Sequence, residues 1–192
     1  MVEFIAMSRA EAQGYLARFL AEMDACVRRV VDEASATGGP APDAWDRTPG
    51  SLGPVWEWAV PRLAWRAGYQ PPAGGAPGPR IAADELEPAE QLPSWFHHPS
   101  AASYALFSAG TLWLIDGLGR YLGETVIANA PRTRWAAGHA RAKGYMFQNQ
   151  PVVHGLADEG SPLHTTAIVV ARALRADPVR GATSLREVYD TW

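Results

Sequence analysis

The sequence contains a single cysteine, Cys26, and this scarcity excludes several classes of protein. One thiol cannot close an intrachain disulfide or supply the paired cysteines of a structural zinc site. Cys26 falls among the apolar residues of the first helical pattern, so we expect a buried side chain and not a reactive nucleophile. The 17 basic residues are outnumbered by 20 acidic ones, and a net charge of −3 provides no positive field for nucleic acid.

Long hydrophobic runs and targeting signals are also missing. The most apolar segment is interrupted by Asp116 and Arg120, so no stretch of 18 uncharged apolar residues occurs. The first residues include Glu3 and lack a basic start followed by an apolar run, so we expect no signal peptide. These features favour a cytoplasmic protein that neither spans a membrane nor binds nucleic acid.

The common catalytic and cofactor motifs do not occur. The sequence contains no GxSxG, GxxxxGK[ST], HExxH, CxxC or DxDxDG pattern. Gly117 and Gly119 lie inside a helical pattern and have Leu122 where a dinucleotide motif needs a third glycine. The adjacent His97 and His98 cannot both lie on one face of a helix or strand, so they make a poor metal site. We therefore expect no cofactor and no metal.

The 192 residues, 47% of them apolar, are enough for a single domain with a sizeable core. Residues 103–135 carry apolar side chains every three or four positions, which predicts a long buried central helix, capped by Ser100, that leads into a strand. Ser103, Gly110 and Gly117 form a second line on this helix. There the missing or small side chains would let another element approach closely.

The N-terminal part of the chain predicts further helices. Ser8 and Glu11 form a capping box, and the helix that it begins extends to just before Gly38. Ser51 caps a second helix, which Pro61 is expected to kink or divide.

A segment rich in proline and glycine, residues 70–93, divides the chain and predicts an extended or mobile loop. It separates a helical half, residues 1–69, from an α+β half, residues 94–192. We interpret the whole chain, residues 1–192, as one domain in which the two halves share a core.

The C-terminal half predicts a small sheet and more helix. Residues 135–139, 145–149 and 151–156 have the patterns of three short strands, and an antiparallel β-meander is the simplest arrangement. Residues 163–174 predict a helix, although a β-branched run leaves a strand open. Residues 183–192 predict a short helix whose terminal tryptophan docks on the body. The expected fold class is α+β, with N-terminal helices, a long central helix, a small β-meander and a C-terminal helix.

Three charged residues of the central helix form the first candidate site. Asp116, Arg120 and Glu124 are spaced four apart, so their charged groups are expected to meet on one face. Two carboxylates beside an arginine could bind a cationic group or, with His139 or His154 from the sheet, perform acid–base chemistry. An ordinary ladder of ion pairs along the helix is the favoured interpretation of the three charged residues. Three histidines, His139, His154 and His164, could ligate zinc, but the favoured interpretation is that they are unrelated.

Tryptophan is unusually dense in the first third of the chain. Four tryptophans, Trp45, Trp56, Trp58 and Trp65, lie within 21 positions. Filling of the core is the favoured interpretation. An aromatic-walled groove for a ligand or peptide is the alternative.

These observations leave three classes of function open. The leading hypothesis is a non-catalytic protein-binding, regulatory or accessory protein, for example an immunity-type factor, because tryptophan concentrates at interfaces. A small hydrolase-like enzyme is the second, with Glu124, Asp116 and His139 or His154 around a pocket lined by Trp113 and Trp135. A homo-oligomeric scaffold is the third. The candidate binding residues are Asp116, Arg120, Glu124, Trp56, Trp58, Trp113 and Trp135.

Two short motifs carry a resemblance to known sequences. The run Tyr121-Leu122-Gly123-Glu124, followed eleven residues later by Trp135, resembles a pattern of uncharacterised bacterial proteins, many of them actinobacterial. The segment SLGPVWEW, residues 51–58, is similar to the SLxPLWxW stretch of those proteins. Here Thr133-Arg134 replaces their usual glycine before the strand tryptophan. The resemblance implies an α+β fold with helices first and a small sheet later, and it carries over no catalytic residues.

Overall fold

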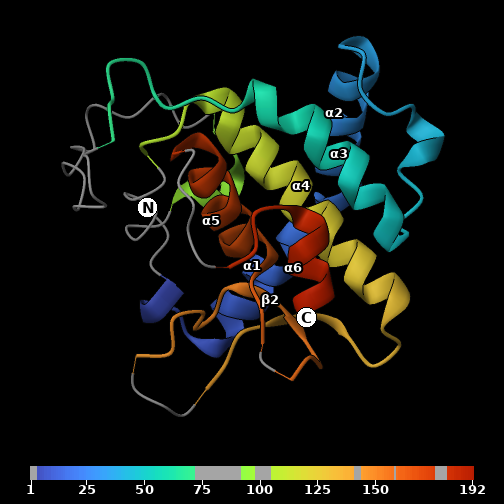
Figure 1. Ribbon diagram of the computed structural model, residues 1–192. Helices are drawn as coiled ribbons and strands as arrows, with labels where there is room; N and C mark the ends of the chain where they lie inside the picture. Colours follow the sequence, from blue (N-terminus) through green and yellow to red (C-terminus); the bar gives the residue numbers. More distant parts are fainter. Residues whose placement is uncertain (1–3, 72–91, 98–104, 141–143, 158, 176–180) are drawn as a thin grey trace.

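The computed structural model describes residues 4–71, 92–97, 105–140, 144–157, 159–175 and 181–192. Helix α4 (Ala109–Asn129) runs through the middle of the molecule and is buried along most of its length (Figure 1). The other elements are α-helices, two strands and short 3-10 helices, written η. They are η1 (Phe4–Ala6), α1 (Arg9–Ala21), α2 (Met23–Ala36), η2 (Pro42–Ala44), η3 (Pro49–Ser51), α3 (Leu52–Ala59), η4 (Val60–Arg62), η8 (Ser94–His97), β1 (Arg134–Ala137), β2 (Pro151–His154), α5 (Pro162–Arg175) and α6 (Leu185–Thr191).

The predicted central helix is confirmed, but it begins later than expected. Its first residue is Ala109, and the Ser108 hydroxyl accepts the amide N–H of Thr111 at 3.2 Å. Ser108 is therefore the cap, and the expectation that Ser100 caps this helix is wrong. Ser100 itself lies outside the described residues, as do residues 72–91 of the predicted Pro/Gly-rich loop.

The N-terminal segment forms two helices where the apolar pattern predicts one. The capping box is confirmed, with the Glu11 carboxylate accepting the Ser8 amide at 2.7 Å. However, α1 ends at Ala21 and α2 starts at Met23, with Glu22 as the joint. The apolar stripe continues across this corner, so the pattern alone contains no sign of it. The physical reason is a contact from α4 that is described below.

The second helical segment is divided at Pro61, as predicted. Helix α3 ends at Ala59, and residues 60–62 continue as the 3-10 helix η4. A proline inside an α-helix removes one backbone hydrogen bond and clashes with the preceding turn, which explains the change of helix type.

The sheet has two strands in the described part of the chain, where the sequence predicts three. Strands β1 and β2 are antiparallel, and Arg134 lies opposite His154 in the ladder. The expected strand at residues 145–149 is wrong, because this segment turns. Asn149 has a φ of 63° there and its amide donates to Gly138 O at 2.7 Å. Residues 162–175 form a helix, and the C-terminal helix is present, so the α+β fold class is confirmed.

Neighbouring elements approach α4 closely where it has glycine. A Cβ at Gly117 would lie 2.8 Å from a methyl carbon of Val30 in α2, and one at Gly119 would lie 2.9 Å from Leu163 in α5. Residues two apart point to nearly opposite sides of a helix, so α2 and α5 flank α4. At Gly110, the other glycine of the predicted line, nothing lies within 4 Å. Close packing is thus confirmed at Gly117 and wrong at Gly110.

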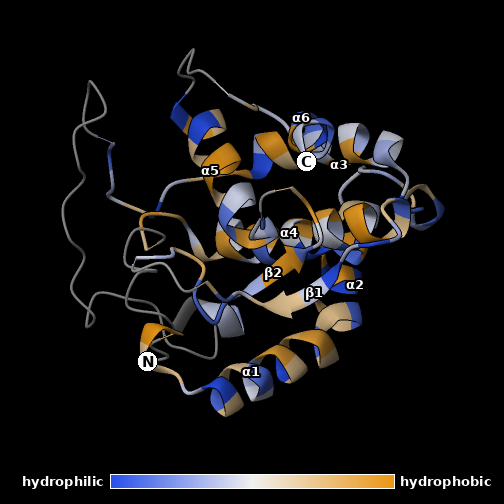
Figure 2. Cartoon of the chain, turned by 90° about the horizontal axis from the view of Figure 1, so that it is seen from below, coloured by the Kyte–Doolittle hydropathy of each residue, from blue (hydrophilic) through white to orange (hydrophobic). Residues whose placement is uncertain are grey.

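The two-stranded sheet forms a layer between α1 and α4. In Figure 2 strands β1 and β2 lie between α1 and α4, and α5 and α6 lie beyond α4. Trp135 of β1 fixes this order, because its ring packs against Gly123 of α4 and, at a centroid distance of 5.2 Å, against Phe19 of α1. None of the helices within the described ranges is long and apolar enough to cross a membrane.

The contrast between the two glycines gives a matched stability test. Gly117→Ala places a methyl group against Val30 and the Cys26 carbonyl, and we expect it to lower the free energy of unfolding by about 1–3 kcal/mol. Gly110→Ala meets nothing and gains helix propensity, so it should leave that free energy unchanged or raise it by up to about 1 kcal/mol. Urea unfolding followed by tryptophan fluorescence measures both. Equal effects at the two positions would contradict the packing described here.

Candidate functional site

Arg120 of α4 is fully buried and links its helix to α1 and to Glu22, the residue between α1 and α2. Its Nε donates to Asp116 Oδ1 at 2.8 Å, and its Nη1 donates to the backbone carbonyl of Phe19 at 2.6 Å. Its Nη2 lies 3.4 Å from the Glu22 carboxylate, and the guanidinium stacks on the Phe19 ring at 3.8 Å. The predicted Asp116–Arg120 contact therefore exists. It lies inside the core, however, and not on a solvated face as an ordinary ladder would.

This contact explains the corner between α1 and α2. In a continuous helix the Phe19 carbonyl would accept the amide of residue 23, and Arg120 supplies a charged donor to the same oxygen. Asp116 is 1% exposed, and with Arg120 it serves the core and presents no charge to a ligand. The half-buried Cys26 lies nearby. Burial and the Asp116 carboxylate raise the pKa of its thiol to about 12, which makes it a poor nucleophile.

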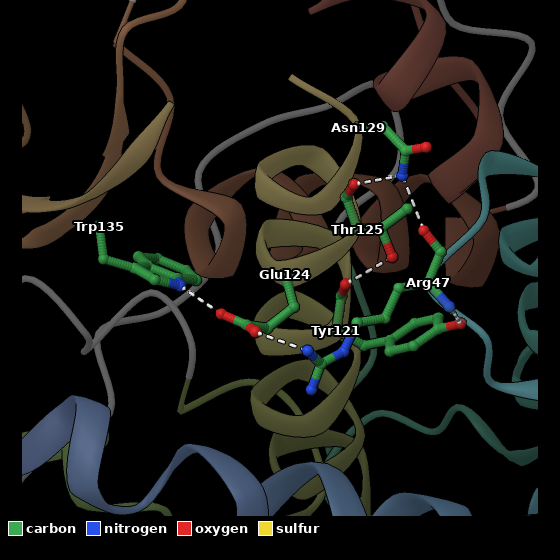
Figure 3. Close-up of polar contacts among 6 residues, drawn as sticks. All are labelled: Arg47, Tyr121, Glu124, Thr125, Asn129 and Trp135. Carbon is green, nitrogen blue, oxygen red and sulfur yellow. Dashed lines mark hydrogen bonds and ion pairs between the residues drawn. The ribbon is translucent and has the colours of Figure 1, made fainter. Parts of the chain in front are cut away.

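Glu124 does not join Arg120, which corrects the expected meeting of three charges. Its Oε1 accepts the indole N–H of Trp135 at 2.9 Å, and its Oε2 pairs with Arg47 at 3.4 Å (Figure 3). The Trp135 ring fits over Gly123 only because that residue has no side chain. A part-buried indole N–H needs an acceptor, and Glu124, one position further along, provides it.

Arg47 also belongs to this cluster, although no pattern in the sequence indicates it. Arg47 has a φ of 60°, its amide donates to the Tyr121 hydroxyl at 3.1 Å, and its carbonyl accepts from Asn129 Nδ2 at 2.7 Å (Figure 3). Three contacts with one helix thus hold the residue in a backbone conformation that non-glycine residues seldom adopt. Glu124 and its partners therefore have a structural role, as Asp116 and Arg120 do: they hold strand β1 and the loop that contains Arg47 against α4.

The sheet histidines have partners other than Glu124. His154 Nδ1 lies 2.6 Å from Glu159 Oε1, and Tyr145 donates its hydroxyl to Glu159 Oε2 at 2.5 Å. His139 Nδ1 instead contacts Gln148 Nε2 at 3.0 Å. Glu124 and a sheet histidine are therefore not brought together among the described contacts. The carboxylate beside the histidine is Glu159, which the sequence shows only as part of an acidic turn.

Electrostatics at Glu159 follow from these contacts. Burial raises the pKa of the Glu159 carboxyl, but hydrogen bonds from Tyr145 and His154 outweigh burial and hold the pKa below its usual value. Burial and the negative carboxylate together raise the pKa of the Tyr145 hydroxyl, which therefore stays protonated and donates.

Backbone geometry brings Glu159 back to His154. The chain reverses after β2 at Gly155, whose φ is 103° and whose Cα lies so near the Arg132 carbonyl that any Cβ would collide with it. Val153 then donates its amide to Gly160 O at 2.9 Å, and the ring of Trp192 packs over Gly160. The expected docking of the terminal tryptophan is thus observed, and it covers the segment that carries Glu159.

The tryptophans do not form one surface. Trp56 and Trp58 are each 6% exposed and belong to the core, which is the interpretation favoured from the sequence. The half-buried Trp65 stacks on Phe107 with ring centroids 5.2 Å apart. Trp113 lies under the guanidinium of Arg29, at 3.8 Å, and so contacts a different element from Trp135. These positions give no support to an aromatic groove or to a pocket that Trp113 and Trp135 line together.

A second cluster that the sequence does not reveal is centred on Asn149. Its Nδ2 donates to the carbonyls of Phe4 at 2.7 Å and Met7 at 3.0 Å, so η1 is fastened to the turn after β1. Ile5, which lies between Phe4 and Met7 in the chain, and Met146, three residues before Asn149, are 78% and 60% exposed. They are the two most exposed large apolar side chains in the part of the chain that the structure describes.

The chain matches no known protein family, and comparisons with curated proteins and with solved structures find no match. Among the residues that the structure places, no three histidine, cysteine or acidic side chains gather in a way that could hold a metal ion.

The lowered pKa of Glu159 predicts how stability depends on pH. A carboxyl with a lower pKa in the folded state stabilises the fold above its unfolded pKa of about 4.3, and that stabilisation is lost as the pH falls towards the folded pKa. We expect Glu159→Gln to lower the free energy of unfolding by about 1 kcal/mol at pH 6, a modest value because solvent partly screens the group. The difference should shrink below about pH 4. Urea unfolding at several pH values measures it, and a difference that grows on acidification would contradict the assignment.

Proposed function

We propose that the protein binds another protein through the surface that Ile5 and Met146 present. The observation that carries this proposal is the exposure of two large apolar side chains on segments that Asn149 holds together. Single exposed apolar residues are ordinary on protein surfaces. Two on adjoining segments, fixed by a dedicated polar contact, favour a binding role.

The rigidity of the support strengthens the argument. Asn149 adopts a φ of 63° and is itself buried. Its side-chain amide donates to the carbonyls of Phe4 in η1 and of Met7 just after it, and its backbone amide donates to Gly138 O. A surface fixed before binding loses less conformational entropy when a partner arrives. Methionine adds adaptability, because its unbranched thioether fits partner surfaces of different shapes.

The surroundings suit an interface with an apolar centre and a polar edge. Gln148, two residues after Met146, contacts His139, and Gln150 donates to the Met146 carbonyl at 2.9 Å. Apolar anchors inside a rim of hydrogen-bonding groups are typical of transient protein–protein interfaces. A regulatory or accessory role, including an immunity-type one, fits such an interface. The tryptophans no longer support this proposal.

A comparison of two double variants tests the proposal. Ile5→Ser with Met146→Ser removes the proposed anchors, and Leu20→Ser with Val60→Ser removes two exposed apolar side chains elsewhere, which are 40% and 38% exposed. Partners captured from the native host by the wild type and identified by mass spectrometry are purified and titrated against each protein. We expect at least about a tenfold loss of affinity, or ~1.4 kcal/mol, for the first variant only.

Two results would contradict the proposal. One is a partner that binds both double variants as tightly as the wild type. The other is self-association of the purified wild type, seen by light scattering and lost in the Ile5/Met146 variant. That result would assign the surface to a second copy of the chain and favour the homo-oligomeric scaffold.

A further inference from the structure

The Tyr145, Glu159 and His154 side chains have the arrangement of a positioned base. Glu159 accepts from Tyr145 with one oxygen and contacts His154 Nδ1 with the other. An imidazole whose Nδ1–H donates to a carboxylate carries its lone pair on Nε2, the atom that accepts a proton in general-base catalysis. His154 is 43% exposed, so solvent and solutes reach it.

The positively charged side chain of Arg134 lies beside His154. Arg134 lies directly opposite His154 in the β1–β2 ladder, and directly opposite residues project from the same face with Cβ atoms roughly 4.5–5.5 Å apart. Arg134 is exposed, and within the described ranges no acceptor engages its guanidinium. Both carboxylate oxygens of Glu159 are already occupied by Tyr145 and His154. Arg134 is therefore available for an anion from solution.

The supporting structure fixes this geometry from several directions. Gly155 allows the chain to reverse after β2 at a point where a Cβ atom would collide with the backbone. The hydrogen bond from the Val153 amide to Gly160 O closes this turn, and the Trp192 ring covers Gly160. The residues that hold Glu159 beside His154 thus come from the sheet, the following loop and the C-terminus. A chance surface pair does not require such support.

We propose that this cluster is a catalytic site at which water hydrolyses a small phosphodiester. A guanidinium fork matches two non-bridging phosphate oxygens, so Arg134 binds the ester. His154 Nε2 takes a proton from the attacking water as the new O–P bond forms and the P–O bond to the leaving alcohol breaks. The proton then passes to the leaving oxygen, and the products are a phosphomonoester and an alcohol. Glu159 and Tyr145 are positioning residues, which hold His154 in the required tautomer.

This inference is independent of the proposed protein-binding surface, because it rests on different side chains. The net charge of −3 argues for a small substrate and against a polynucleotide. The matched probes are bis(p-nitrophenyl) phosphate, an anionic diester, and p-nitrophenyl acetate, a neutral ester that any accessible imidazole attacks.

The test compares the full-length wild type with four variants. We expect the wild type to release p-nitrophenolate from the diester above the buffer blank, and His154→Gln to lower that rate by about 100-fold or more. Arg134→Gln should raise KM for the diester and leave acetate hydrolysis unchanged. Glu159→Gln should lower kcat with little change in KM, and Glu159→Asp should recover part of the loss. Arg186→Gln, which removes an exposed arginine paired with Asp190, is the control and should match the wild type.

Two results would overturn the inference. The first is diester hydrolysis by the wild type no faster than the blank. The second is equal hydrolysis by wild type and His154→Gln, with circular dichroism showing both folded. Should His154→Gln fail to fold, an NMR titration of the wild type with inorganic phosphate decides. Shifts confined to the amides of residues 132–134 and 153–160 support the site, and their absence overturns it.

Discussion

The buried guanidinium of Arg120 is the contact on which the arrangement of the helices depends. Removing a guanidinium and a carboxylate from water costs several kcal/mol for each ion, and only a partner with good geometry offsets that cost. Asp116 supplies the opposite charge at 2.8 Å, and the Phe19 carbonyl supplies a further acceptor at 2.6 Å. Because Phe19 belongs to α1 and Glu22 forms the corner before α2, one side chain of α4 determines where both N-terminal helices lie.

The position of the sheet follows from the same helix. Gly123 leaves room for the Trp135 ring, and Glu124 accepts the indole N–H, so β1 is fixed against α4. Phe19, which Arg120 holds in place, forms the other wall of the Trp135 site. The core contacts therefore determine where the surface of the hairpin lies, and with it the positions of Arg134 and of His154. Of the polar residues that the sequence suggests as a site, Asp116 and Arg120 serve the core, whereas His154 of β2 is partly exposed to solvent.

The sequence predicts what depends on local pattern and misses what depends on distant contacts. The central helix follows from apolar spacing, and the Asp116–Arg120 pair follows from i, i+4 geometry. The corner at Glu22 does not follow from a local pattern, because its cause is the side chain of Arg120, nearly a hundred residues away. The same i, i+4 spacing predicts the wrong partner, Arg120, for Glu124, because Trp135 of the sheet and Arg47 of a distant loop engage its carboxylate. Asn149 interrupts a strand-like pattern, since its side chain binds backbone carbonyls at the other end of the chain.

The most direct test of this account is the coupling energy between Asp116 and Arg120, measured by a double-mutant cycle. Urea titration measures the free energy of unfolding of four proteins: the wild type, Asp116→Ala, Arg120→Ala and the double variant. The coupling energy is calculated from these four values. The account predicts that each single change costs about 3–5 kcal/mol, because it leaves a buried charge without a partner, and that the coupling is at least about 2 kcal/mol. Asp116→Asn and Arg120→Lys complete the same cycle if an alanine variant does not fold. A coupling below about 0.5 kcal/mol would show that the two residues act independently and would contradict the central role given to this buried pair.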